Sequence, residues 1–291
     1  MAQPLLGAHE SVAGGMAEGI RRARELGCES LQVFVKNSNQ WRARPFTPAE
    51  IEAYRAAHAA SEIGPVVAHA GYLINLAAPE GENREKSRAG LADELGRCDR
   101  LGIVGLVVHP GAHLGRGIDD GIATVVESID GVYGARDAAR TPTLLELTAG
   151  AGTHLGSKLE ELAAIRAASR FPASIGFCLD TCHAFAGGYP IHEASGWSRF
   201  LADVDRILGL ERVACWHLND SVGALASHKD RHAPIGEGAL GRDAFARLVN
   251  DPALAGVPLL LETPLGDDGR GHARDLETLR GLLKAPAKKK R

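Results

Sequence analysis

The side chains with the clearest chemical potential lie at the end of an apolar stretch in the middle of the chain. Residues 175–179 are almost entirely apolar, and they are followed at once by Asp180 and, three residues later, by His183. A short apolar run of this kind is typical of a strand that is buried on both faces. A carboxylate and an imidazole at the exit of such a strand could bind a metal ion, but a single pair is more often a satisfied buried Asp beside a loop His. The prediction therefore depends on whether the pattern recurs.

The same pattern recurs along the chain. Six of eight apolar stretches end on a side chain that can bind a metal, and these side chains are His69, His109, Glu146, Asp180, His217 and Glu262. Three further candidates follow two of these stretches, and they are His183, Asp230 and His232. Histidine and carboxylate ligands without cysteine suit zinc or a similar divalent ion at a catalytic site.

Nine candidate ligands are too many for one tetrahedral ion. We therefore expect a site with several ions, in which some coordination positions stay open to water and substrate. Such a cluster of divalent ions lowers the pKa of bound water and neutralises the charge that develops on a phosphoryl oxygen. The reaction class that the candidate site favours is hydrolysis of a phosphate ester.

Eight short apolar stretches, each followed by a stretch of helical character, must position these side chains. The predicted strands are residues 5–9, 31–35, 65–68, 103–108, 143–145, 175–179, 212–216 and 257–261. Eight such repeats with buried strands predict an α/β protein, a single-domain (β/α)₈ TIM barrel, and a doubly wound open sheet is the alternative fold. Because all strands of a barrel end at one mouth, the candidate ligands are expected to converge there.

Three of the helices are predicted in more detail. Thr47, Pro48 and Glu50 form an N-cap, a proline at the first helical position and an acid three residues after the cap, so a helix is expected to begin there. Further helices are expected over residues 83–101 and 119–136.

The composition fits one large intracellular domain. The chain has 291 residues, of which 45% are hydrophobic, and no break in composition marks a second domain. We expect one domain over residues 1–284 and a short basic tail over residues 285–291. Five cysteines without framework spacing suggest reduced thiols, residues 1–10 lack the charged start and apolar core typical of a signal peptide, and no apolar run reaches membrane length. A cytoplasmic protein that does not contact a membrane is the expectation.

The net charge and the absence of certain motifs argue against two kinds of binding. A net charge of −3 argues against a nucleic-acid binder that works through overall positive charge, although it leaves a local positive site open. The chain has no Gly-x-Gly-x-x-Gly after its first predicted strand and no phosphate-loop pattern, so no nucleotide cofactor is expected.

Five further motifs lie between Leu6 and Pro264, and they are Phe34-Val35-Lys36-Asn37 with Gln40-Trp41-Arg42, His69 to Leu76, Cys178 to Tyr189, His217 to Ser221, and Lys229 to His232. With these motifs the chain resembles the endonuclease IV family of abasic-site (AP) endonucleases, zinc-dependent enzymes of the xylose-isomerase-like TIM barrel superfamily. The resemblance implies a (β/α)₈ barrel that cuts double-stranded DNA on the 5′ side of an abasic site. The products would be a 3′ hydroxyl and a 5′ deoxyribose phosphate, and trimming of blocked 3′ ends is expected as well.

The resemblance also implies a set of metal ligands. All nine positions that correspond to ligands of the family's three zinc ions hold the expected residue type: His69 and His109 with the bridging Glu146; Asp180, His217 and Glu262; and His183, Asp230 and His232. Glu146 and Glu262 are the expected catalytic residues, and Glu262 would orient or deprotonate the attacking water. Manganese in place of zinc at one site stays open.

The residues implied to contact DNA lie after the second and third predicted strands. Tyr72 and Leu73 match residues that wedge into the duplex at the flipped-out site, which is easiest where a base is missing. Asn39 stands where the family usually has an arginine that enters the helix. Leu147, Ala151 and His154 are further departures, and they can loosen the support of the bridging carboxylate.

Two other functions stay open at this point. A sugar isomerase or epimerase of related barrel fold would use Glu146, Asp180, His217 and Glu262 with one or two ions, and the remaining five ligands would then be idle. A non-catalytic damage-binding protein would keep the lesion pocket without turnover. The expected partner is DNA that contains abasic sites, and a monomer is the simplest expectation.

Overall fold

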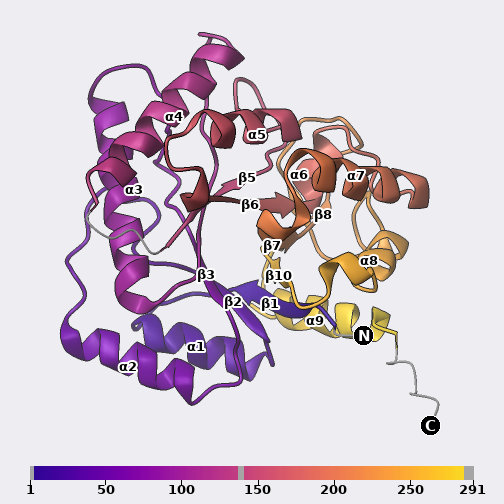
Figure 1. The fold of residues 1–291 in the computed structure, drawn as a ribbon. Coiled ribbons are helices and arrows are strands. Elements are labelled where there is room, and N and C mark those ends of the chain that lie inside the picture. Colours follow the sequence, from indigo (N-terminus) through magenta and orange to yellow (C-terminus); the bar gives the residue numbers. More distant parts are fainter. Residues whose placement is uncertain (1–2, 137–140, 285–291) are drawn as a thin grey trace.

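The computed structural model describes residues 3–136 and 141–284, and these residues form a barrel of eight parallel strands (Figure 1). The strands are β1 (Leu5–His9), β2 (Ser30–Phe34), β3 (Val66–His69), β4 (Leu106–Val108), β5 (Thr143–Glu146), β6 (Ile175–Asp180), β7 (Val213–Leu218) and β10 (Pro258–Leu261). β1 pairs with both β2 and β10, so that Ala8 lies beside Leu31 on one side and Leu261 on the other. This pairing closes the sheet, which confirms the predicted barrel and excludes the open sheet.

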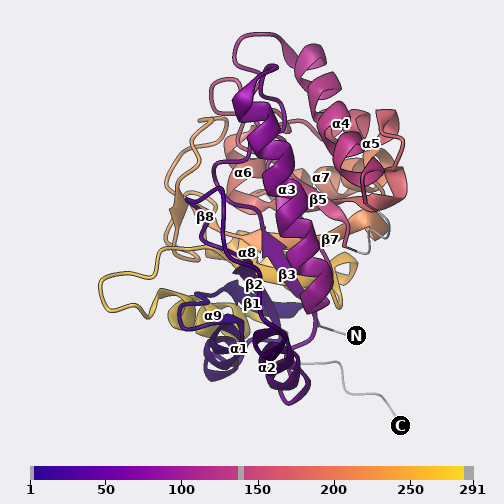
Figure 2. The ribbon, with the colours of Figure 1, turned by 90° about the vertical axis from the view of Figure 1, so that its left-hand side faces the viewer.

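Helices surround the barrel and connect its strands (Figures 1 and 2). They are α1 (Met16–Glu25), α2 (Pro48–Ala59), α3 (Glu82–Leu101), α4 (Ile118–Gly134), α5 (Leu159–Ala168), α6 (Thr181–Ala186), α7 (Ala194–Ile207), α8 (Arg242–Leu248) and α9 (Gly271–Leu282). Three short 3₁₀ helices cover Pro172–Ser174, Leu210–Arg212 and Pro252–Leu254. Within the described ranges, no helix combines the length and the apolar character needed to cross a membrane.

The strand period decides which side chains point into the barrel. A small cluster of buried residues fills the barrel interior, and it consists of Val67, Val107, Leu144, Cys178, Cys215 and Leu260. Each of these residues precedes one of the six strand-end candidates by two positions in the sequence. Since alternate residues of a strand share a face, the candidates stand on the same inner face, one layer closer to the mouth.

Two details of the helices show how local sequence sets the element boundaries. The predicted start of α2 is confirmed: Thr47 and Glu50 form a reciprocal capping box ahead of the helix. β4 begins at Leu106 rather than at residue 103, because the chain is still completing α3. Gly102 adopts a left-handed conformation (φ 76°), and the Ile103 N–H donates to the Cys98 carbonyl.

The loop after β7 contains two short antiparallel strands that the sequence did not predict, β8 (Asp220–Ser221) and β9 (His232–Ala233). Buried Asp220 stabilises this loop by accepting hydrogen bonds from the backbone N–H groups of Gly236, Gly238 and Leu240. The predicted basic tail, residues 285–291, lies outside the described residues.

Candidate metal centre

The nine predicted ligands meet at the mouth of the barrel. Six of them lie at the ends of β3, β5, β6, β7 and β10 or just beyond β4, and the other three come from α6 and the loop that includes β9. A cavity of about 300 Å³ opens at this place, and its lining includes His69, His109, His183, Asp230, His232 and Glu262. Its volume is at the lower end of the range for ligand pockets, so it suits a group the size of one nucleotide rather than a duplex.

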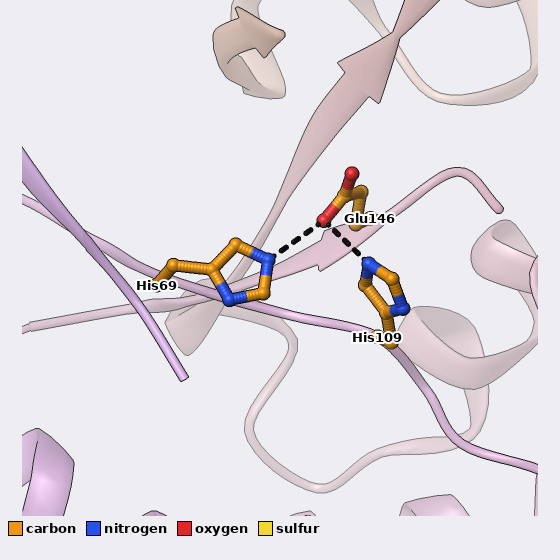
Figure 3. Close-up of side chains that lie close together, drawn as sticks. All are labelled: His69, His109 and Glu146. Carbon is orange, nitrogen blue, oxygen red and sulfur yellow. Dashed lines mark hydrogen bonds and ion pairs between the residues drawn. The ribbon is translucent and has the colours of Figure 1, made fainter. Parts of the chain in front are cut away.

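The first group of ligands is His69, His109 and Glu146. The Nε2 atoms of both imidazoles point at the same carboxylate oxygen, Glu146 Oε2, at 3.1 Å and 3.0 Å (Figure 3). Glu146 is fully buried, whereas about a third of the His109 side chain is exposed to the cavity. A metal ion at this point would therefore be reachable from the cavity.

The second group shares Glu146 with the first. His217 Nδ1 lies 3.0 Å from Glu146 Oε1, 3.2 Å from Glu262 Oε2 and 3.9 Å from Asp180 Oδ2. The two oxygens of Glu146 thus face different groups of ligands. A carboxylate in this position can bridge two cations, and three carboxylates so close together need positive charge between them.

The third group consists of His183, Asp230 and His232. Asp230 Oδ1 lies 3.2 Å from His183 Nε2 and 3.3 Å from His232 Nε2. Although these contacts are short, neither buried nitrogen has a hydrogen-bond partner of acceptable geometry among the described residues. Two imidazole nitrogens and a carboxylate that face a common point without hydrogen bonding are a donor set that fits a divalent ion.

Backbone carbonyls hold three of the imidazoles in the orientation that a metal requires. The Nδ1 atoms of His69, His183 and His232 lie 2.8, 3.0 and 3.1 Å from the carbonyl oxygens of Ala70, Leu147 and Glu262. A carbonyl oxygen can only accept, so each Nδ1 carries a proton, and each Nε2 is the nitrogen that could present a lone pair to a cation once its own proton has been displaced. The bond from His183 uses the Leu147 backbone, which is why the unusual side chain at 147 leaves it intact.

The charges of the cluster stabilise each other in the protein without ions. Burial alone would raise the pKa of Glu146 and Glu262, but the neighbouring imidazoles, His217 first, outweigh it and hold both pKa values well below the usual range. Burial lowers the pKa of His217, whereas Glu262 and Glu146 raise it more, to about 10. Protons therefore occupy positions that cations could take, and metal binding must displace them.

The three residues expected to contact DNA lie near the mouth. Tyr72 is 70% exposed and Leu73 is 38% exposed, and Tyr72 lines the cavity with its ring edge against Phe34. Asn39 is exposed on the neighbouring loop after β2. The Tyr72 N–H donates to the Ser38 carbonyl at 3.0 Å, so the two loops are joined.

Two buried amides in the site were missed by the sequence analysis. The Asn219 amide donates to Asp180 Oδ2 at 2.6 Å and accepts from the Glu262 N–H at 2.9 Å. Gln32, in the middle of β2, contacts both His217 and Glu262. For Gln32 the available signal was a polar residue within an apolar strand, whereas Asn219 follows the end of β7 and gave no such signal.

Comparison with known proteins gives consistent matches over nearly the whole chain. Residues 20–282 match the family described as xylose isomerase-like TIM barrel. A protein of Chloroflexus aurantiacus named probable endonuclease 4 is 46% identical over 280 residues, which cover 96% of this chain and 98% of that protein. The protein of the same name from Geobacter sulfurreducens is 46% identical over 286 residues, covering 98% and 97%. The crystal structure of endonuclease IV from Thermus thermophilus superimposes with a TM-score of 0.84 at 40% identity, covering 96% of this chain and 98% of that one.

Proposed function

This chain belongs to the endonuclease 4 family of xylose isomerase-like TIM barrels, and on that premise we propose that it is a metal-dependent DNA repair endonuclease that acts at abasic sites. The reaction is hydrolysis of the phosphodiester on the 5′ side of the abasic sugar, and it leaves a 3′ hydroxyl and a 5′ deoxyribose phosphate. Blocked 3′ ends are a second substrate of the same site. The observation that carries the proposal is the convergence of three ligand groups, two of them joined through Glu146, on one cavity.

The ligand groups would hold three zinc ions, with manganese as an alternative at one of them. The donor sets are His69, His109 and Glu146; Glu146, Asp180, His217 and Glu262; and His183, Asp230 and His232. When bound, the ions supply Lewis acidity toward the phosphoryl oxygens and lower the pKa of water.

Glu262 is suited to handle the proton of the attacking water. Its side chain is 18% exposed and lines the cavity, whereas Glu146 is fully enclosed. A carboxylate that is ionised and reaches the cavity can accept a proton from water beside it. Glu146, by contrast, fixes the spacing between the first two ligand groups.

Tyr72 and Leu73 select the substrate by entering the duplex beside the abasic site. Both are large hydrophobic side chains exposed at the mouth, next to the cavity that receives the sugar. Insertion between bases requires unstacking, and this is least unfavourable where a base is already missing. Asn39, on the adjoining loop, contributes a polar contact rather than the charge of an arginine.

A sugar isomerase or epimerase is disfavoured by the third ligand group. That function would use the group around Glu146 and His217, and it would leave the imidazoles of His183 and His232 without a role.

The enzyme acts as a monomer in this proposal, and we place it in the cytoplasm, where its five free buried cysteines stay reduced.

The proposal is tested with a labelled duplex that carries one abasic site, beside the same duplex with an intact base. Zinc-loaded protein should make one nick on the 5′ side of the abasic sugar and leave an end that a polymerase extends. The variant His232→Ala should lose this activity. Tight binding without a nick would instead indicate a damage-binding protein. A protein that neither binds nor cuts the abasic duplex would contradict the proposed function.

A further inference from the structure

Gln32 is a fully buried amide that contacts two of the candidate ligands from β2, a strand that is separated from β10 by β1 and from β7 by β1 and β10. It lies in the middle of β2, whereas the ligands that it meets lie in β7 and just after β10. Its Nε2 is 2.6 Å from Glu262 Oε1, and its Oε1 is 2.8 Å from His217 Nε2. No other side chain would reach this point from β2, because the residues beside it, Leu31 and Val33, face the surrounding helices.

The chemistry of its partners fixes how the amide is oriented. The ionised Glu262 carboxylate can only accept hydrogen bonds, so the NH₂ group of Gln32 must face it. The amide oxygen then faces His217, and since that oxygen can only accept, Nε2 of His217 must carry a proton. Nδ1 of His217 is therefore the ring nitrogen that can present a lone pair, and it points at Glu146 and Glu262.

The second N–H of the amide is also used. Gln32 Nε2 lies 3.0 Å from Nδ1 of His9, whose ring packs against Phe34 at a centroid distance of 4.4 Å. The NH₂ group and the oxygen of this amide therefore both have side-chain partners. Satisfied polar networks of this kind restrict their members to one arrangement.

We propose that Gln32 is a positioning residue, which sets the tautomer and ring orientation of His217 and at the same time aims the Glu262 carboxylate. Its effect passes through these two side chains, since Gln32 is fully buried and does not line the cavity. The inference rests on the proposed metal site, because Gln32 would act only by hydrogen bonding to two of the residues that bind the metal. Removal of such partners lowers metal affinity or activity by about 10- to 100-fold.

The test replaces Gln32 by Met, which keeps the length of the side chain but removes both hydrogen-bonding groups. Gln3→Leu is a matched control, because Gln3 is exposed before β1 at the opposite end of the barrel. Zinc affinity is measured by competition with a chromophoric chelator, and folding by thermal melting of the zinc-free proteins. We expect zinc affinity to fall by about 10- to 100-fold in the Met variant and to stay unchanged in the control.

Kinetics separate positioning from a general loss of structure. With saturating zinc, the Met variant should show a reduced kcat and an unchanged KM for abasic duplex, because Gln32 does not touch DNA. A folded Met variant with wild-type zinc affinity and kcat would overturn the inference. If the Met variant does not fold, Gln32→Glu serves instead. The carboxylate of this variant can still accept a hydrogen bond from His217 but cannot donate one to Glu262, so kcat should again fall. A wild-type kcat would contradict the inference.

Failure of the proposed function gives a different result. If the wild-type protein does not cut abasic duplex, the nuclease assignment is wrong, yet the comparison of zinc affinities still tests the role of Gln32. If the wild-type protein cuts normally and the folded variants match it in affinity and kcat, only the inference about Gln32 is wrong.

Discussion

At the scale of single residues, Glu146 is the centre of the site. One of its oxygens faces two imidazoles and the other faces His217 and His183, so this one side chain joins the first two ligand groups and also contacts the third. It is fully buried, and its charge is matched only by its neighbours. Any change of this charge should therefore disturb both groups at once.

Glu146→Gln should abolish cleavage while the barrel still folds. The amide keeps the shape of the carboxylate but cannot bridge two cations, so we expect zinc content to fall and activity to drop by more than about 100-fold, beyond the loss seen for partners behind a ligand. Cleavage rate and zinc content are the measurements. Glu160→Gln, an exposed change at the start of α5, is the control, and unchanged activity of Glu146→Gln would contradict the mechanism.

The sequence predicted that these candidate ligands lie together at one end of the barrel, but it did not indicate the buried amides that contact them. Glu146 and Asp180 were visible because each ends an apolar run, and a barrel brings all such ends together. Gln32 was not visible as part of the site, because its partners His217 and Glu262 are 185 and 230 residues away in the chain. A polar residue within an apolar strand marks an inward position, but it does not say which groups lie opposite.

At the scale of elements, a buried ion pair joins the two loops that we expect to contact DNA. Lys36, just after β2, lies 3.2 Å from Glu94 on α3 and donates to the Trp41 carbonyl. Glu94 in turn accepts from the Gly71 N–H at 3.1 Å, directly before Tyr72. The pair therefore holds both loops against the same helix.

Lys36→Met should weaken both stability and substrate binding. It leaves Glu94 buried without its cationic partner, with only the Gly71 N–H still donating to it, so we expect a loss of about 3 kcal/mol in the free energy of unfolding. Because Tyr72 loses its fixed position, KM for abasic duplex should rise more than kcat falls. Denaturant titration and steady-state kinetics measure these effects, and Lys86→Met, which removes an exposed pair on α3, is the control. An unaltered KM in a folded Lys36→Met variant would show that the pair does not position the loops.

A second polar contact joins α4 to the end of α5. Buried Asp130 accepts hydrogen bonds from the Ser169 hydroxyl and from the backbone and side chain of Arg170. Burial raises the pKa of Asp130, but these hydrogen bonds outweigh it, so the pKa is lowered from the usual value. An acid with a lowered pKa in the folded state stabilises the fold above its unfolded pKa, and this contribution is lost as pH falls through the folded pKa.

Asp130→Asn should therefore lower stability at neutral pH and matter little in acid. At pH 7 we expect a loss of about 2 kcal/mol, typical of hydrogen bonds to a charged group. As the pH falls through the lowered pKa of Asp130, the difference from the wild-type protein should shrink, because the native carboxylate becomes protonated. Urea unfolding at several pH values measures this, and a difference that stays constant with pH would contradict the assigned charge.

Element boundaries show where local sequence information is sufficient. The start of α2 could be predicted because its capping box is local. The late start of β4 and the short strands β8 and β9 could not, because they depend on how α3 ends and on the contacts of Asp220 with a distant part of its loop. Such contacts between distant residues leave no periodic pattern in the chain.

At the scale of the whole molecule, a negatively charged protein must bind negatively charged DNA, and the proposed metal site would supply the positive charge for this. The net charge of the chain is −3, which gives no general attraction to phosphates. Three divalent ions would add six positive charges and turn this value into +3, concentrated at one mouth of the barrel. The attraction would then be local, and it would coincide with the cavity where the phosphodiester must be cut.

The most direct test of the account is the number and position of zinc ions in a crystal of the zinc-loaded protein, measured by anomalous scattering at the zinc edge. We predict three peaks: one between His69, His109 and Glu146, one beside Asp180, His217 and Glu262, and one between His183, Asp230 and His232. A single peak at the second position, with the third group empty, would contradict the three-ion nuclease and favour a sugar isomerase or epimerase.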